Sequence, residues 1–151
     1  TGLDLVEQQL LVACGERLTP EVVAAGSRGH AVEARVYAED PGRGFLPQPG
    51  RIEALTWPSG EGIRVDSGVV AGLEVTPHYD PMLAKIIAYG RDRGEAIARL
   101  DRALAATELR LVGPKGDRVT NLQFLRAVLA SAEFVSRDYD TSLAEKLVKR
   151  P

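Results

Sequence analysis

The chain reads RGHAVEARVYAEDPGRGFLPQPGRI from Arg28 to Ile52. The first part of this segment alternates between two kinds of residue, and the last part is a loop rich in Gly and Pro. Alternation with a period of two is typical of a β-strand that buries one face and exposes the other. The face that can be buried carries His30, Val32, Ala34 and Val36, and the opposite face carries Ala31, Glu33, Arg35 and Tyr37.

Arg35 is the strongest candidate for a functional residue on this strand, because it lies between Glu33 and Tyr37 on the polar face. A guanidinium is always charged and presents a rigid fork of donors, so it is well suited to holding an anion or an oxyanion. The alternative is an ordinary surface ion pair with Glu33, which is common and contributes little stability. From the residues alone both interpretations stay open, and the surface pair is the commoner case.

Two short motifs near this strand carry further polar groups. The motif Glu39-Asp40-Pro41 is interpreted as an Asx-type turn before proline rather than as a pair of functional carboxylates. Residues 77–81, PHYDP, place polar side chains between two prolines and predict a rigid loop. Asp80 of this loop is a candidate partner for an arginine such as Arg35.

The size and composition of the chain limit the classes of protein to which it can belong. A length of 151 residues, 44% of them hydrophobic, suffices for one domain with a core. A net charge of -2 disfavours a nucleic-acid partner. The sequence has no signal-peptide pattern and no apolar run long enough to cross a membrane. The single cysteine, Cys14, cannot form an internal disulfide, which favours a reducing, cytosol-like compartment, and we expect it to be a small core residue.

The periodicity of the chain changes from helix to strands and then back to helices. Capping boxes are expected at Asp92 with Glu95 and at Thr120 with Gln123. The expected elements are helices over 3–13, 92–107, 120–132 and from 141 to the end, strands over 28–38, 51–57, 63–66, 82–89 and 109–112, and a hairpin-like turn over 58–62. This order predicts an α+β fold, in which helices flank an antiparallel β-sheet.

The residues alone do not supply a complete catalytic constellation. The chain has no P-loop and no glycine motif for a dinucleotide. It also lacks a nucleophile elbow and any set of residues spaced like metal ligands, so no metal site is expected. The residues by themselves therefore do not indicate an enzymatic mechanism.

Four motifs, taken together, resemble the C-terminal region of biotin carboxylases. They are RGHAVEARVYAED from Arg28, FLPQPGRI from Phe45, YDPMLAKI from Tyr79 and TNLQFL from Thr120, in the family's order and at near-family spacing. The resemblance covers essentially the whole chain, and it favours the functional interpretation of the strand arginine over the surface ion pair. It implies the fold of the biotin carboxylase C-terminal domain, which is a rudimentary single hybrid motif.

The same resemblance implies the domain boundaries. Residues 28–151 correspond to the C-terminal domain of the family. Residues 1–27, which open with TGLDLVE, resemble the helical tail of the family's ATP-grasp domain and a linker. Residues 113–118, GPKGDR, depart from the family pattern and are expected to form a small surface insertion.

The resemblance also implies an activity. Biotin carboxylases use ATP and Mg²⁺ to join bicarbonate, through carboxyphosphate, to N1′ of biotin on a carrier protein. The implied cofactors of the full-length enzyme are therefore biotin, ATP and Mg²⁺, here in an acyl-CoA (acetyl-, propionyl- or methylcrotonyl-CoA) carboxylase of fatty acid metabolism. The implied partners are the ATP-grasp domain, a biotin carboxyl carrier domain, a second copy in a homodimer and a carboxyltransferase subunit. The implied location is the cytoplasm, or the mitochondrial matrix in a eukaryote.

Site residues follow by position in the family motifs. Arg35 matches the arginine that contacts biotin and stabilises its enolate-like oxyanion, so it is the expected catalytic residue. Tyr79 and Asp80 match the loop that flanks the site and are expected to support biotin binding. Thr141 falls where the family's C-terminal segment contacts the adenine pocket, and Arg64 falls in the dimer-interface stretch.

The family's nucleotide-binding lysines, metal-binding glutamates and bicarbonate-binding segment have no counterpart in this sequence. We therefore expect the chain to be part of a longer enzyme, to be inactive alone, and to bind none of the cofactors tightly. The alternative is a free-standing interaction or regulatory module that uses the same domain without catalysis. An upstream reading frame with a Gly-rich loop and a Glu-x-Asn-x-Arg segment would rule that module out.

Overall fold

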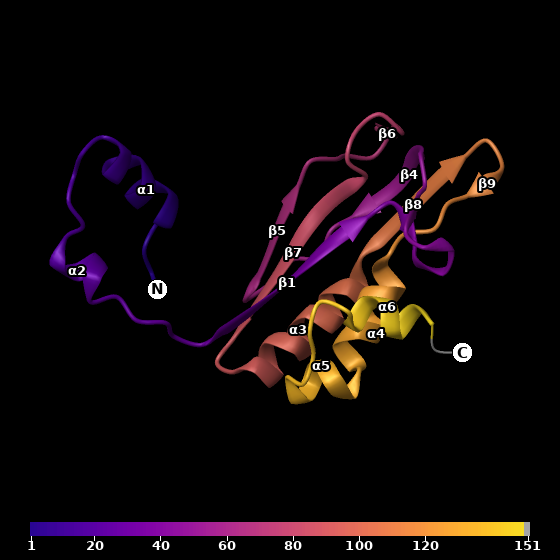
Figure 1. Cartoon of the computed structure of the whole chain (residues 1–151). Coiled ribbons are helices and arrows are strands. Elements are labelled where there is room, and N and C mark those ends of the chain that lie inside the picture. The colour runs from indigo at the N-terminus through magenta and orange to yellow at the C-terminus, as the bar shows by residue number, and fades with distance from the viewer. Residues whose placement is uncertain (150–151) are drawn as a thin grey trace.

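The computed structural model describes residues 1–149 (Figure 1). They form an N-terminal arm, a body of antiparallel strands and a layer of helices. The helices are α1 (Leu5–Ala13), α2 (Pro20–Val23), η1 (Pro41–Arg43), α3 (Arg93–Ala106), α4 (Leu122–Ala130), α5 (Ala132–Ser136) and α6 (Leu143–Val148). The strands are β1 (His30–Tyr37), β2 (Glu39–Asp40), β3 (Leu46–Pro47), β4 (Gly50–Thr56), β5 (Ile63–Ser67), β6 (Glu74–Val75), β7 (Met82–Gly90), β8 (Glu108–Gly113) and β9 (Gly116–Asp117).

The strands form two main antiparallel sheets. One sheet has the order β1-β7-β5 and the other has the order β6-β4-β8-β9, while β2 and β3 pair separately. The long apolar segment of residues 82–90 is the central strand β7, which pairs with β1 on one side and with β5 on the other. The predicted α+β class with an antiparallel sheet and flanking helices is confirmed.

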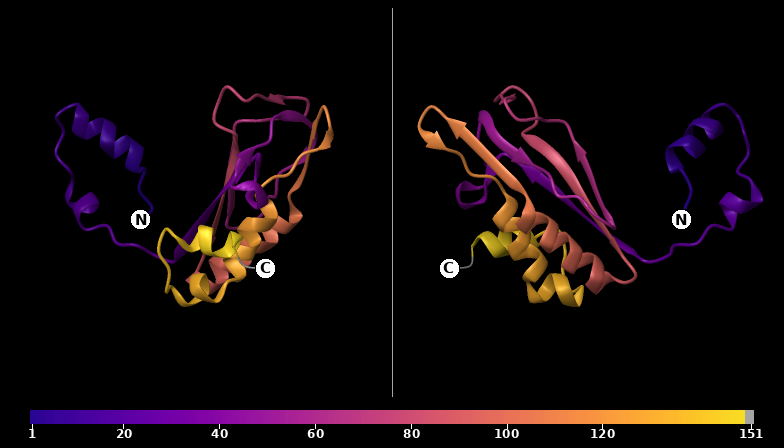
Figure 2. Two further views of the ribbon diagram at one scale, coloured as in Figure 1. Left: turned by 45° about the vertical axis from the view of Figure 1, so that its right-hand side comes forward. Right: turned by 180° about the vertical axis from the view of Figure 1, so that it is seen from behind.

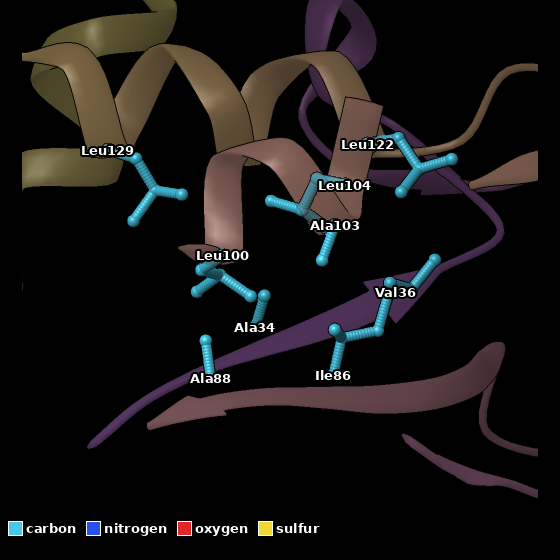
Figure 3. Packing of buried hydrophobic residues seen from close by; sticks show 9 residues of the cluster. All are labelled: Ala34, Val36, Ile86, Ala88, Leu100, Ala103, Leu104, Leu122 and Leu129. Atoms are coloured by element: carbon cyan, nitrogen blue, oxygen red, sulfur yellow. The ribbon is translucent and has the colours of Figure 1, made fainter. Parts of the chain in front are cut away.

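Helices α3 and α4 cover one face of the sheet β1-β7-β5 (Figure 3). The strand β1 buries the face that its alternation predicted, and β7 contributes its inward residues to the same cluster. Burying a side chain of the Leu or Ile type contributes about 1.5–3 kcal/mol, so this cluster fixes the helices on the sheet. Its buried members are Ala34, Val36, Ile86, Ala88, Leu100, Ala103, Leu104, Leu122 and Leu129.

The expected hairpin over residues 58–62 is wrong. Strands β4 and β5, on either side of it, belong to different sheets, and β5 pairs with β7 instead. Trp57, which directly precedes the turn, packs against the buried clusters of both sheets. The segment therefore carries the chain from one sheet to the other, because the apolar residues on its two sides belong to different cores.

One predicted capping box is half right and the other is wrong. Asp92 caps α3, since its Oδ1 accepts a hydrogen bond from the Glu95 amide at 2.9 Å. The Glu95 carboxylate accepts a hydrogen bond from the Arg91 amide, whereas a capping box requires one from the Asp92 amide. At α4, Asn121 rather than Thr120 occupies the cap position, and its side chain makes no capping bond because β1 engages it.

The N-terminal arm, residues 1–27, stands apart from the body in every view (Figure 2). Asp4 caps α1 by accepting bonds from the amides of Val6 and Glu7, but α1 contains no buried residue. Cys14 follows α1 and is exposed, so the expectation of a core cysteine is wrong. The reason is that α1 contains no buried residue and its apolar side chains are open to solvent, so it provides no core for the cysteine that follows it.

Candidate functional site

The face of the sheet β1-β7-β5 that α3 and α4 leave uncovered carries two of the predicted site residues, Arg35 and Arg64. Directly opposite residues in antiparallel strands point to the same side of a sheet, so the register defines this surface. We call it the outer face. It comprises Glu33 and Arg35 from β1, Lys85, Ile87 and Tyr89 from β7, and Arg64 and Asp66 from β5.

Arg35 lies exposed on the outer face, with 59% of its side chain accessible. Its Nε donates to Oε1 of Glu33 at 3.0 Å. This hydrogen bond raises the pKa of the Arg35 guanidinium further above its usual value, and the Glu33 charge and the Tyr37 hydroxyl add to the effect. Glu33 therefore takes the Nε–H and restrains the guanidinium. The two terminal nitrogens have donors left for a ligand.

Asn121 anchors the backbone of β1 at Arg35, and sequence reasoning missed this role. The residue is only 5% exposed. Its Nδ2 donates to the Arg35 carbonyl at 3.0 Å, and its Oδ1 accepts from the Tyr37 amide at 2.8 Å. These two bonds serve the free edge of β1 as a neighbouring strand would. The TNLQFL motif was the available signal, since a buried Asn requires partners.

The loop with Tyr79 and Asp80 lies beside the end of β1, where the Ala38 amide donates to the Pro81 carbonyl at 2.9 Å. Asp80 accepts a bond from the Met82 amide at 2.8 Å, which makes it a turn residue. In the described chain, the ion-pair partner of Arg35 is Glu33, so the expected Arg35–Asp80 pair is wrong. Asp80 is occupied by its own loop.

Tyr79 of that loop is strongly exposed, with an accessible fraction of 83%. Together with Asp80 it lines a cavity of about 260 Å³, whose other walls include Val69, Leu73 and Met82. The loop thus presents a phenol and a carboxylate next to an apolar hollow. This arrangement suits a ligand that has one polar end and one apolar end.

Glu39 adds a carboxyl group at the same end of β1. Partial burial raises its pKa above the ordinary value of 4.5, and the nearby negative charge of Asp80 raises it further. Asp40 forms the predicted Asx-type turn, because its Oδ1 accepts from the Gly42 amide at 3.0 Å. Glu39 is therefore the carboxyl group near the loop whose protonation the fold favours.

Arg64 lies on β5, on the same outer face as Arg35 but on the other side of β7. Its Nε donates to Oδ1 of Asp66 at 2.9 Å, which raises the pKa of Arg64. The structure thus places on one face of the sheet two residues for which the family resemblance implies separate roles.

Thr141 lies away from the outer face. It is exposed and directly precedes Ser142, the cap residue of α6, which lies beside α4 (Figures 1 and 2). Asp140 accepts hydrogen bonds from both the amide and the hydroxyl of Ser142, and these bonds lower the pKa of the Asp140 carboxyl. The turn that presents Thr141 is therefore internally braced, while Thr141 itself faces solvent.

Lys85 is a further charged residue of the outer face, and the sequence analysis assigned it no role. It lies directly opposite Arg35 on β7 and is half-buried. The available signal was a single charged residue inside the otherwise apolar segment MLAKIIAY, where a lysine must point away from the core.

The described residues of this chain do not meet the requirements of ATP and Mg²⁺. Among residues 1–149, no group of three His, Cys, Asp or Glu side chains is placed to hold a metal ion. The same residues form no glycine-rich loop that leads into a helix and could cradle phosphates. This part of the chain thus does not fit a magnesium nucleotide by itself.

The segment of residues 113–118 forms a tight extension of the second sheet. Val112 and Gly113 pair with Asp117 and Gly116, so the insertion is the turn between β8 and β9. The Arg118 side chain lies over Gly113, since a Cβ at this position would be only 2.1 Å from Nε of Arg118. The segment expected to form a small surface insertion is therefore a β-hairpin that the Arg118 side chain contacts.

The architecture defines an α+β domain with helices on one face of a sheet and a charged, arginine-bearing face on the other. Residues 33–146 match the family model described as "Biotin carboxylase C-terminal domain". The chain therefore belongs to the biotin carboxylase C-terminal domain family.

Curated relatives and solved structures agree with this family. The chain is 44% identical to a biotin carboxylase of Halalkalibacterium halodurans over 99% of the chain and 31% of the relative. It is 40% identical to a pyruvate carboxylase subunit of Methanothermobacter thermautotrophicus over 97% of the chain and 28% of the relative. The chain thus spans about a third of the length of these relatives.

Two solved structures show the same fold over the whole chain. The biotin carboxylase domain dimer of Hydrogenobacter thermophilus 2-oxoglutarate carboxylase, in complex with MgADP and bicarbonate, matches with a TM-score of 0.85 at 31% identity, over 100% of this chain and 33% of that one. Pyruvate carboxylase of Rhizobium etli matches with a TM-score of 0.86 at 35% identity, over 100% of this chain and 15% of that one. Carboxylases named for pyruvate and 2-oxoglutarate thus appear beside the biotin carboxylases, and family membership does not single out an acyl-CoA carboxylase.

Proposed function

We propose that this chain forms the biotin side of a biotin carboxylase active site, whose ATP-grasp portion lies in another part of the same polypeptide. The observation that carries the proposal is the exposed Arg35, fixed by Glu33 at one nitrogen and by Asn121 through the strand backbone. Carboxylation of the biotin ureido nitrogen requires negative charge to develop on the ureido oxygen. Biotin would supply that nitrogen, and the protein must hold the developing charge.

Arg35 is suited to this task because its guanidinium is already charged and restrained before a ligand arrives. A preorganised donor costs little reorganisation when charge develops, and this is the main source of oxyanion stabilisation in enzymes. Tyr79 and Asp80 form the neighbouring wall, and the apolar hollow beside them is suited to the aliphatic part of a carrier-bound ligand. Orientation by this wall and charge stabilisation by Arg35 are the two contributions that we assign to the chain.

The remaining parts of the proposal rest on family membership. ATP, Mg²⁺ and bicarbonate would be bound mainly outside this chain, with Thr141 contacting the adenine pocket. Arg64 would lie at the interface with a second copy, in line with the dimer named for the Hydrogenobacter relative. A biotin carrier domain and a carboxyltransferase would complete the enzyme, in an acyl-CoA carboxylase or a related one, and we place it in the cytoplasm by analogy with the bacterial relatives. None of the described helices is both long and apolar enough to span a membrane.

The N-terminal arm supports the proposal of a longer polypeptide. It exposes several large apolar side chains that a stable surface would cover. An ATP-grasp portion is the natural cover, and we assign residues 1–27 to it and residues 28–151 to the C-terminal domain. The exposed apolar residues of the arm include Leu5, Val6, Leu10, Leu11, Val12, Leu18 and Val23.

The experiment that tests the proposal uses the polypeptide that carries both this chain and an ATP-grasp portion. Arg35→Met should lower kcat for carboxylation of free biotin about 10²–10³-fold, the usual loss when one oxyanion donor is removed, and should leave ATP binding intact. The readout is ADP formation that depends on both bicarbonate and biotin. Biotin turnover within a few-fold of wild type would contradict the role of Arg35.

A matched control is Arg110→Met. Arg110 is 63% exposed and pairs with Asp117 at 3.2 Å, so it resembles Arg35 in exposure and partner but lies on the other sheet. Its loss should leave turnover unchanged. Residues 1–151 alone should show no bicarbonate-dependent ADP formation, and measurable turnover by this chain would overturn the assignment of the ATP-grasp portion to another part of the polypeptide.

A further inference from the structure

Lys85 occupies the centre of the outer face. The register places it directly opposite Arg35 on one side and directly opposite Asp66 on the other. Side chains at such positions have Cβ atoms about 4.5–5.5 Å apart, so the Lys85 ammonium and the Arg35 guanidinium can reach the same point above the sheet. The two cations come from neighbouring strands of one rigid sheet, and they are therefore fixed relative to each other.

The carboxylates around Lys85 are already engaged. Glu33 holds Nε of Arg35 at 3.0 Å, and Asp66 holds Nε of Arg64 at 2.9 Å. Within residues 1–149, the Lys85 side chain has neither an ion pair nor a hydrogen bond. The outer face thus holds three cations, at residues 35, 64 and 85, and two carboxylates, at residues 33 and 66. One positive charge remains uncompensated at its centre.

Within this arrangement, the Arg35–Lys85 pair is repulsive. Like charges directly opposite each other on neighbouring strands destabilise a sheet. Lys85 is also half-buried, so water screens its charge less than at an open surface. An anion between Arg35 and Lys85 would turn this repulsion into two attractions. An opposite charge beside a preorganised cation pair is bound more strongly than beside either cation alone.

We propose that Lys85 is a second cationic residue of the biotin site, which holds together with Arg35 the oxyanion that develops on the ureido oxygen. Lys85 donates a hydrogen bond to that oxygen and forms no covalent bond, so no proton or electron pair leaves the residue. The inference rests on the proposed function, because it takes the Arg35 ligand to be biotin. It gives Lys85 a direct contact with the ureido oxygen of biotin. This role follows neither from the ion pairs of the chain nor from its sequence motifs.

The test uses the polypeptide with both portions and three variants: Lys85→Met, which keeps the length of the side chain without its charge, Lys85→Arg, which keeps the charge, and Lys115→Met. Lys115 is an exposed lysine at the tip of the β8–β9 turn and serves as the control. Lys85→Met should lower kcat for biotin carboxylation about tenfold or more, in the lower range of losses at an oxyanion site. The KM for ATP and the biotin-independent cleavage of ATP should not change. Lys85→Arg should restore most of the activity.

A double-mutant cycle separates this role from a structural one. If both cations hold the same oxyanion, the losses in Arg35→Met and Lys85→Met will be non-additive. Unchanged kcat in Lys85→Met, strictly additive losses, or a Lys85→Arg variant as poor as Lys85→Met would each overturn the inference. Absence of biotin-dependent turnover in the wild-type polypeptide would instead overturn the proposed function, so the two failures are distinguishable.

Discussion

At Glu39, partial burial and the Asp80 carboxylate both raise the pKa of the carboxyl above 4.5. The folded state therefore holds this proton more tightly than the unfolded chain does. The stability that protonated Glu39 contributes is fully present below pH 4.5 and is lost as the pH rises through the raised pKa. The residue thus makes the fold slightly less stable at neutral pH than at acidic pH.

Glu39→Gln should remove this pH dependence. The variant should gain stability relative to wild type at about pH 7 and lose that advantage at about pH 4, with a difference below about 1 kcal/mol because the group is partly exposed. Urea unfolding at the two pH values measures the effect. Glu145→Gln, which changes an exposed carboxylate on α6, is the control and should show no such difference. An advantage of the same size at both pH values would contradict the assignment.

Single residues also show what the sequence can and cannot predict. The two faces of β1 follow from alternation alone, and both are as predicted. Asn121 and Lys85 could not be assigned, because their roles depend on neighbours distant in the chain. Asn121 forms hydrogen bonds with residues 84 and 86 positions away, and the role that we propose for Lys85 depends on the β1–β7 register. Local pattern gives the direction of a side chain, whereas its partner is a property of the tertiary fold.

At the scale of elements, α3 depends on its cap. At the start of this helix, which covers the sheet, Asp92 accepts a hydrogen bond from the Glu95 amide. Asp92→Ala should destabilise the protein by about 1 kcal/mol, the usual cost of losing an N-cap. Urea unfolding measures this loss. Asp92→Asn should retain most of the stability, since Asn caps as well as Asp does. Equal losses in the two variants would show that the charge at Asp92, not its capping bond, matters.

The elements themselves were predictable wherever the apolar pattern was long, as in the apolar run of β7 and the helical periodicity of α3. The pairing of the strands was harder to predict. The chain between β4 and β5 carries Pro58 and two glycines and looks like a hairpin turn, yet Trp57 before it reaches into both cores. Turn chemistry is local, but strand pairing is decided by which apolar faces can be buried together. The same limit explains the second capping box, where a tertiary bond from Asn121 to β1 replaces a local cap.

At the scale of the whole molecule, the arm is the segment that we propose an ATP-grasp portion covers. Helix α1 has a well-formed cap and no buried residue, and Leu10 at its centre is 64% exposed. A helix of this length is marginal in water by itself, and most of its stability must come from packing of an apolar face. The isolated chain and the longer polypeptide should therefore respond differently to the same substitution in the arm.

Leu10→Asp should destabilise the longer polypeptide by about 1.5–3 kcal/mol, the free energy of burying a leucine side chain, because the ATP-grasp portion would cover this position. In residues 1–151 alone the same change should have an effect within about 0.5 kcal/mol, as for other surface substitutions. Thermal or urea unfolding of both forms measures the difference. Gln9→Asp, one position earlier on the same helix, introduces the same charge and should be mild in both forms. Equal effects of Leu10→Asp in the two forms would show that the arm packs against nothing in the longer protein, and residues 1–27 would then be a linker rather than the tail of an ATP-grasp domain.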